Sequence, residues 1–159
     1  MKHLLFLVLF AAASCTQAQD GWQAIGELRD GKAMLTADKS ELLQVYNQNL
    51  QRVSGINGDF KDVKIEAGAQ EAYTLVFTGE AYKSTFRVEK ADDGIALRVN
   101  YTISCTTTDC SHEISGCEPR FDGGDRGYCS PCSNDGECTK TETNSSLLHA
   151  GLSVKDVKD

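Results

Sequence analysis

The chain has 159 residues, with 23 acidic and 16 basic side chains and a net charge of −7. Because an acidic protein repels phosphate groups, this charge argues against nucleic acid or an anionic lipid surface as a partner. The length is enough for one domain once an N-terminal signal is removed.

The first 18 residues are typical of an export signal. Lys2 precedes an apolar run from Leu4 to Ala13, and small residues follow the run. This arrangement indicates secretion. The run is too short for a membrane-spanning helix, which needs about 20 apolar residues. We therefore expect an exported protein.

Two cleavage positions stay open. Residues 1–15 end in Ala12-Ala13-Ser14-Cys15, which resembles a bacterial lipoprotein signal. The resemblance implies that Cys15 carries the lipid and that the mature protein is anchored in the bacterial cell envelope. The alternative is cleavage after Ala18, which discards Cys15 and releases a secreted protein. The only membrane contact that we expect is through the lipid anchor on Cys15, which the secreted alternative lacks.

Residues 19–104 are expected to form an α+β domain. Residues 16–36 predict a tether and then a short irregular or strand segment. A helix is predicted from Asp38 to Val53, with Asp38 as its N-cap, Glu41 three residues later, and Gly55 as the residue that ends it. The side chains that form its apolar stripe are Leu42, Tyr46, Leu50 and Val53.

After the helix, apolar and polar side chains alternate, which is typical of strands with one buried face. The alternation covers residues 63–66, 73–78, 86–89 and 95–104, and Asp93-Gly94 predicts a tight turn before the last segment. A sheet of this kind needs a cover on one face, which the helix supplies. The expected fold is one helix packed on a roughly four-stranded antiparallel meander, followed by a cysteine-rich, disulfide-stapled extension.

Residues 105–138 are expected to form that extension, packed on the domain. They contain few large apolar side chains, so cross-links are needed to offset the entropy of ordering, each contributing about 2–4 kcal/mol. In an oxidising compartment thiols pair, which predicts three disulfides whose pairing stays open. The six cysteines are Cys105, Cys110, Cys117, Cys129, Cys132 and Cys138.

Two other interpretations of these cysteines stay open. Cys105-x4-Cys110 and Cys129-x2-Cys132 together resemble the two knuckles of a zinc ribbon, which implies four thiolates around one zinc ion. Cys129-Ser130-Pro131-Cys132 resembles a thioredoxin-like active site, which implies thiol–disulfide exchange through Cys129 and Cys132.

The mature chain shows no catalytic constellation, and residues 139–159 predict either a tail or a last strand. Our interpretation is an exported, non-enzymatic binding or structural protein without a metal or other cofactor. Its partner would be an unidentified protein or small-molecule ligand, and its oligomeric state stays open.

Overall fold

The computed structural model describes residues 22–67, 73–100, 102–113, 116–121, 127–143 and 146–149. The export signal and Cys15 lie outside these residues. The described part contains one α-helix and ten β-strands. Within it, no helix has the length and hydropathy of a membrane-spanning segment.

The helix α1 lies between the second and third strands along the chain. It covers Lys39–Ser54. The strands are β1 (Trp22–Arg29), β2 (Lys32–Leu35), β3 (Asp62–Ala67), β4 (Tyr73–Thr78), β5 (Lys83–Lys90), β6 (Ala96–Asn100), β7 (Ile103–Thr107), β8 (Pro119–Phe121), β9 (Gly127–Cys129) and β10 (Thr139–Glu142).

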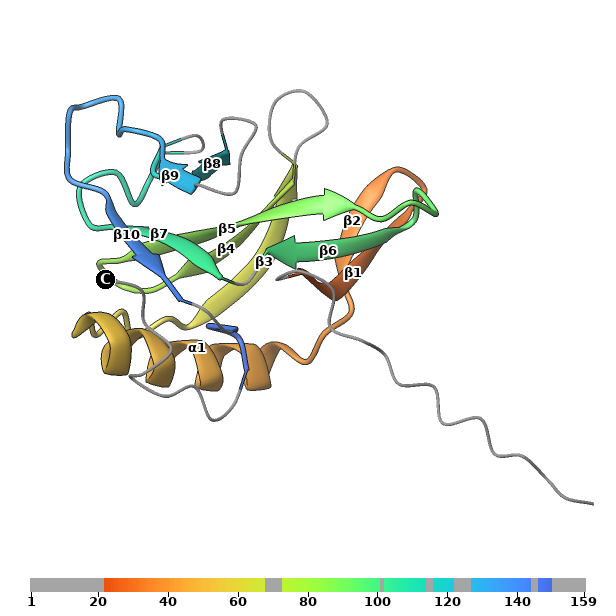
Figure 1. Ribbon diagram of the computed structural model, residues 1–159, viewed down its shortest axis with the longest axis horizontal. Helices are drawn as coiled ribbons and strands as arrows, with labels where there is room; N and C mark the ends of the chain where they lie inside the picture. The colour runs from red at the N-terminus through yellow and green to blue at the C-terminus, as the bar shows by residue number, and fades with distance from the viewer. Residues whose placement is uncertain are drawn as a thin grey trace, which may run out of the picture.

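Eight strands form one antiparallel sheet with β5 at its centre. One edge of β5 pairs with β4, which in turn pairs with β3. The other edge pairs with β6 along its C-terminal half and with β7 along its N-terminal half. From there β1 and β2 continue beyond β6, and β10 lies beyond β7. The sheet curls until β2 contacts β3, so that it is nearly barrel-shaped (Figure 1).

The expected α+β class is confirmed, but the four-stranded meander is wrong. The N-terminal segment, expected as a short irregular or strand segment, is a hairpin of β1 and β2. Asp30 and Gly31 form its turn with φ of 50° and 75°, and such an Asp-Gly pair is the sequence signal that could have predicted it. The hairpin contributes to the core, because Ile25 of β1 is buried in it and Leu28 packs against it.

The expected strand 95–104 is two strands, β6 and β7, which both lie along β5. Val88 is opposite Val99, whereas Thr85 is opposite Cys105, so three steps along β5 match six steps along the partner. The register therefore slips by three residues between β6 and β7. Because three is an odd number, the alternation of side chains between the two faces of the sheet is reversed in β7. Ile103 therefore lies on the other face from Val99, where its side chain closely approaches Gly127.

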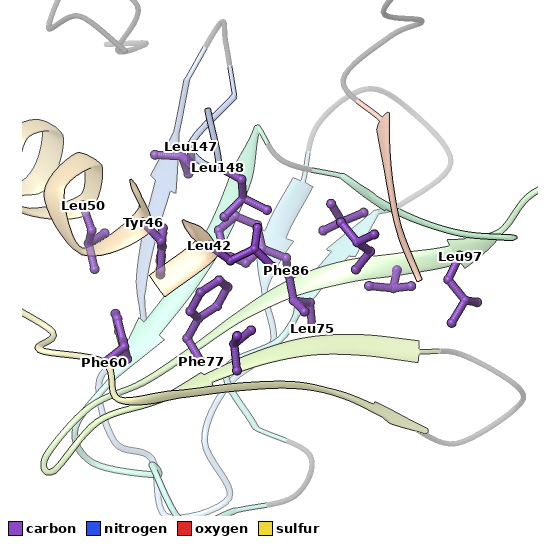
Figure 2. Packing of buried hydrophobic residues seen from close by; sticks show 14 residues of the cluster. Leu42, Tyr46, Leu50, Phe60, Leu75, Phe77, Phe86, Leu97, Leu147 and Leu148 are labelled. Carbon is purple, nitrogen blue, oxygen red and sulfur yellow. The ribbon is translucent and has the colours of Figure 1, made fainter. Parts of the chain in front are cut away.

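The helix begins and ends as predicted. The Asp38 side chain accepts a hydrogen bond of 2.8 Å from the Glu41 amide, and Gly55 takes the left-handed conformation with φ of 73°. On the inner side, Tyr46 packs against Phe77 and Phe86 with ring centroids 4.5 and 4.9 Å apart (Figure 2). The aromatic rings thus fix α1 on the concave face of the sheet.

The C-terminal part of the described chain completes this core. After β10, Leu147 and Leu148 are buried beside α1 (Figure 2). The Asn49 amide donates hydrogen bonds of 2.9 Å to the carbonyls of Leu147 and His149. The segment expected as a tail or last strand therefore begins as β10 and turns back into the core, while residues 150–159 lie outside the described residues.

Candidate functional site in the disulfide-linked module

The cysteine-rich segment covers the face of the sheet opposite α1. We call residues 108–113, 116–121 and 127–138 the disulfide module. Figure 1 shows α1 below the sheet and the β8–β9 hairpin of the module above it. Ser84 contacts Tyr46 on the helix side, so Lys83 and Thr85, its neighbours on β5, point to the module.

Lys83 holds the module through two backbone carbonyls. Its side-chain ammonium donates hydrogen bonds of 2.7 Å to the carbonyl of Glu113 and 2.9 Å to that of Gly116. The residue is only 4% exposed. Burial lowers the pKa of Lys83, and the carboxylates of Glu118, Glu113 and Glu66 oppose that shift. Lys83 is therefore a buried cation that fastens the module to β5.

Other polar side chains of the sheet make further contacts of this kind. The hydroxyl of Thr85 donates to the Cys117 carbonyl at 2.6 Å, and that of Thr107 donates to the Glu137 carbonyl at 2.7 Å. The Arg87 guanidinium lies 4.9 Å from the centre of the Phe121 ring, a cation–π contact. Since buried carbonyls need partners, these contacts explain why this sheet face is polar and yet buried.

Three disulfides close the module. The pairs are Cys105–Cys129, Cys110–Cys132 and Cys117–Cys138, with Cα atoms 5.7, 5.7 and 5.5 Å apart. The first cysteine bonds to the fourth, the second to the fifth and the third to the sixth, so the three closed loops overlap along the chain. Cys105 lies within β7 itself. The first disulfide thus ties β9 of the module directly to the main sheet.

The cysteines of the zinc-ribbon and thioredoxin-like resemblances form disulfides that neither resemblance implies. The four cysteines of the zinc-ribbon spacing form the disulfides Cys105–Cys129 and Cys110–Cys132, and a disulfide sulfur is not a thiolate ligand. Cys129 and Cys132 bond to different partners rather than to each other. The Cys129–Cys132 segment therefore lacks the internal disulfide of an oxidised thioredoxin-like site.

Two of the disulfides lie side by side. The Sγ atoms of Cys105, Cys129 and Cys138 are all within 4.8 Å of one another. We call these three residues, together with Cys117, the disulfide partner of Cys138, the sulfur cluster. Cys105 and Cys117 are buried, whereas Cys129 and Cys138 are partly exposed. The spacing could not predict this cluster, because it depends on which cysteines pair.

Carboxylates tie the turns of the module together. Glu113 accepts hydrogen bonds from the amide and the hydroxyl of Ser133, at 3.0 and 2.8 Å. Asp109 accepts one from the Glu137 amide at 2.8 Å. These bonds lower the pKa of both carboxyl groups. The two acidic side chains thus connect turns of the module that lie far apart in the chain, by hydrogen bonds to Ser133 and Glu137.

The outer side of the module presents a tyrosine to solvent. Tyr128 of β9 is 51% exposed and lies opposite Arg120 of β8. The Arg120 guanidinium pairs with the Glu118 carboxylate at 2.9 Å. Pro131 is exposed nearby in the chain. Tyr128 therefore stands on a short strand whose next residue is held by a disulfide to β7.

Comparisons of this chain with protein-family models, with curated proteins and with solved structures each found no match.

Proposed function

We propose that the protein is an exported, non-enzymatic binding or structural protein, anchored to the bacterial cell envelope through a lipid on Cys15. The observation that carries the proposal is the disulfide module, a cysteine-rich segment that two disulfides close on itself and that a third, Cys105–Cys129, ties to the sheet. Disulfides of this kind form and persist in oxidising compartments outside the cytoplasm. They support export, and the lipoprotein-like end of residues 1–15 motivates the anchor.

The binding part of the proposal rests on how the module is held. Lys83, Thr85 and Thr107 bond its backbone to the sheet, in addition to the disulfides. Loops held on a rigid scaffold are common binding elements, because little ordering entropy is lost when a partner binds. Exposed tyrosine is enriched where proteins bind partners. We therefore place the binding surface around Tyr128.

The test of export and anchoring uses the full chain in a bacterium that processes lipoproteins. The wild-type protein is expected in the membrane fraction, with a mass that includes acyl chains and a mature chain beginning at Cys15. Cys15→Ser is expected to lack the acyl mass and to leave the membrane fraction. Identical masses and fractions for the two proteins would refute the anchor. Free thiols without reduction would refute the oxidised scaffold.

The test of binding uses the purified mature protein, immobilised and exposed to envelope extract from its host. We expect a component that the wild type retains and Tyr128→Ser loses. Met34→Ser is the matched control, because Met34 is also an exposed large apolar residue, 46% exposed, on β2 rather than on the module. Equal retention by both variants, or loss with Met34→Ser alone, would refute the surface around Tyr128.

A further inference from the structure

The sulfur cluster has the features of a reactive site, and this inference goes beyond the proposed binding function. We propose that its two disulfides form one thiol-reactive unit, in which a small external dithiol opens Cys117–Cys138, closes its own disulfide and so releases the Cys138 thiolate, which then attacks Cys129. The result is a rearranged protein with a Cys129–Cys138 disulfide and free Cys105 and Cys117. The proposal stands on proximity, exposure and charge.

Proximity makes the transfer possible without a large movement. The Sγ atoms of Cys105, Cys129 and Cys138 lie within 4.8 Å of one another while the disulfides are intact. Exchange requires a thiolate to reach a disulfide sulfur. Once Cys138 is released, it already lies beside the Cys105–Cys129 bond. The intramolecular attack thus has a high effective concentration.

Exposure limits where an external thiol can enter. In the Cys117–Cys138 disulfide, Cys117 is fully buried and Cys138 is partly exposed. An external thiolate can therefore reach the sulfur of Cys138, and Cys129, which is also partly exposed, is the other sulfur of the cluster that it can reach. The rearrangement starts from the attack on Cys138. In contrast, both residues of Cys110–Cys132 are buried, at 2% and 3% exposed. That disulfide is shielded and is expected to stay intact.

A lysine lies opposite Cys105. Lys140 lies directly opposite Cys105 in the pairing of β10 with β7, so their side chains share one face of the sheet. Its ammonium donates a hydrogen bond of 3.1 Å to the Gly127 carbonyl on β9 and pairs with Glu142 at 2.9 Å. A neighbouring cation stabilises a thiolate leaving group. From its place opposite Cys105 we assign to Lys140 the role of a positioning residue that favours Cys105 as the leaving thiolate, and hence attack on Cys129.

The reaction balances in three steps. First, one thiolate of a small dithiol bonds to Cys138, and Cys117 leaves as a thiolate that takes a proton from water. Second, the other thiolate of the reagent closes the reagent's own disulfide and releases Cys138. Third, Cys138 bonds to Cys129, and Cys105 leaves and is protonated. In sum, the dithiol is oxidised and one protein disulfide is reduced.

The test treats the oxidised mature protein with less than one equivalent of dithiothreitol, blocks free thiols with N-ethylmaleimide, and maps the disulfides by mass spectrometry without reduction. We expect a Cys129–Cys138 peptide pair with blocked Cys105 and Cys117. Blocked Cys117 and Cys138 with an intact Cys105–Cys129 bond would overturn the proposal. Complete reduction of a fraction of the chains would also overturn it.

Two cysteine variants distinguish the proposed disulfide exchange from a general loss of stability of the module. Cys117→Ser leaves Cys138 without its partner, and the variant is expected to carry a Cys129–Cys138 bond and a free Cys105. Cys110→Ser is the control, since Cys132 lies outside the sulfur cluster and is expected to stay a free thiol. If Cys138 stays free in Cys117→Ser, the exchange is refuted. Should that variant fail to fold, the mapping of the wild type decides.

The role of Lys140 has its own measurement. Lys140→Met is expected to slow the appearance of free Cys105 several-fold, and Lys140→Arg, which keeps the charge, is expected to restore the rate. Equal rates in all three proteins, or a Cys105–Cys138 bond in the wild type, would overturn the assigned role of Lys140. None of these readouts depends on the lipid anchor or on a binding partner.

Discussion

Thr85 of the central strand and Cys117 of the disulfide module are joined by a hydrogen bond of 2.6 Å from the threonine hydroxyl to the cysteine carbonyl. Both residues are buried, and Cys117 has a positive φ of 55°. An uncommon backbone conformation is maintained where its surroundings hold it. The sheet thus holds the module in two ways. One is this hydrogen bond to the backbone at Cys117, and the other is the Cys105–Cys129 disulfide.

The first prediction tests this hydrogen bond. Thr85→Val keeps the shape of the side chain and leaves the buried Cys117 carbonyl without its hydroxyl donor. The free energy of unfolding is expected to fall by about 1–3 kcal/mol. Urea unfolding of the oxidised protein measures it. Thr36→Val, at an exposed threonine, is the control with little expected change. A Thr85→Val variant as stable as the control would contradict the prediction.

The second prediction concerns the pH dependence that Lys83 causes. Burial lowers its pKa in the native protein below the ordinary lysine value of the unfolded chain, about 10.4. Between these two values the unfolded chain binds a proton that the native protein does not, so stability rises with pH. Below the native pKa the contribution of this group is constant, because both states are protonated.

The measurement compares the wild type with Lys83→Met in urea from pH 7 to about pH 10. The free energy of unfolding of the wild type, relative to the variant, is expected to increase as the pH approaches the ordinary lysine value. The comparison cancels the titration of groups that both proteins share. A relative stability that stays flat or falls over this range would refute the assignment to Lys83.

The third prediction concerns the turn after β10. Asn49→Leu removes the amide that donates to the carbonyls of Leu147 and His149. We expect a loss of about 2 kcal/mol and faster hydrogen exchange at residues 146–149. Gln48→Leu, on the exposed side of the same helix, is the control. If both variants exchange at the wild-type rate in this turn, Asn49 does not hold it.

The fourth prediction concerns the start of α1. Asp38→Ala removes the side-chain acceptor of the Glu41 amide and is expected to cost about 1 kcal/mol. Asp38→Asn keeps an acceptor and is expected to retain most of the stability. Thermal unfolding followed by circular dichroism compares the three proteins. An alanine variant as stable as the asparagine variant would show that the cap contributes nothing measurable.

Local physics explains which parts of the fold could be predicted. The bounds of α1 follow from Asp38 and Gly55, whose effects reach only a few residues along the chain. The strands β3, β4 and β5 follow from an alternation of apolar side chains that needs one buried face. The Asp30-Gly31 turn was equally local, and its signal was present although the hairpin was not predicted.

For the disulfide module, the sequence could predict which cysteines form disulfides but not how they pair. That the six would pair follows from an oxidising compartment, but the sulfur cluster requires a particular pairing and a particular placement of β9 over β7. The same holds for Lys83, a residue type that is usually exposed. Its burial depends on two carbonyls, those of Glu113 and Gly116, about thirty residues away along the chain.

The sequence by itself determined the helix, the strands β3, β4 and β5, and a cysteine-rich segment that needs cross-links. Only the tertiary structure decided how that segment sits on the sheet. The reason is the slip of three residues where the chain passes from β6 to β7 along β5. Because side chains alternate along a strand, this odd slip turns Cys105 and Ile103 away from α1 and toward the module, a change of face that an unbroken alternation of residues does not reveal.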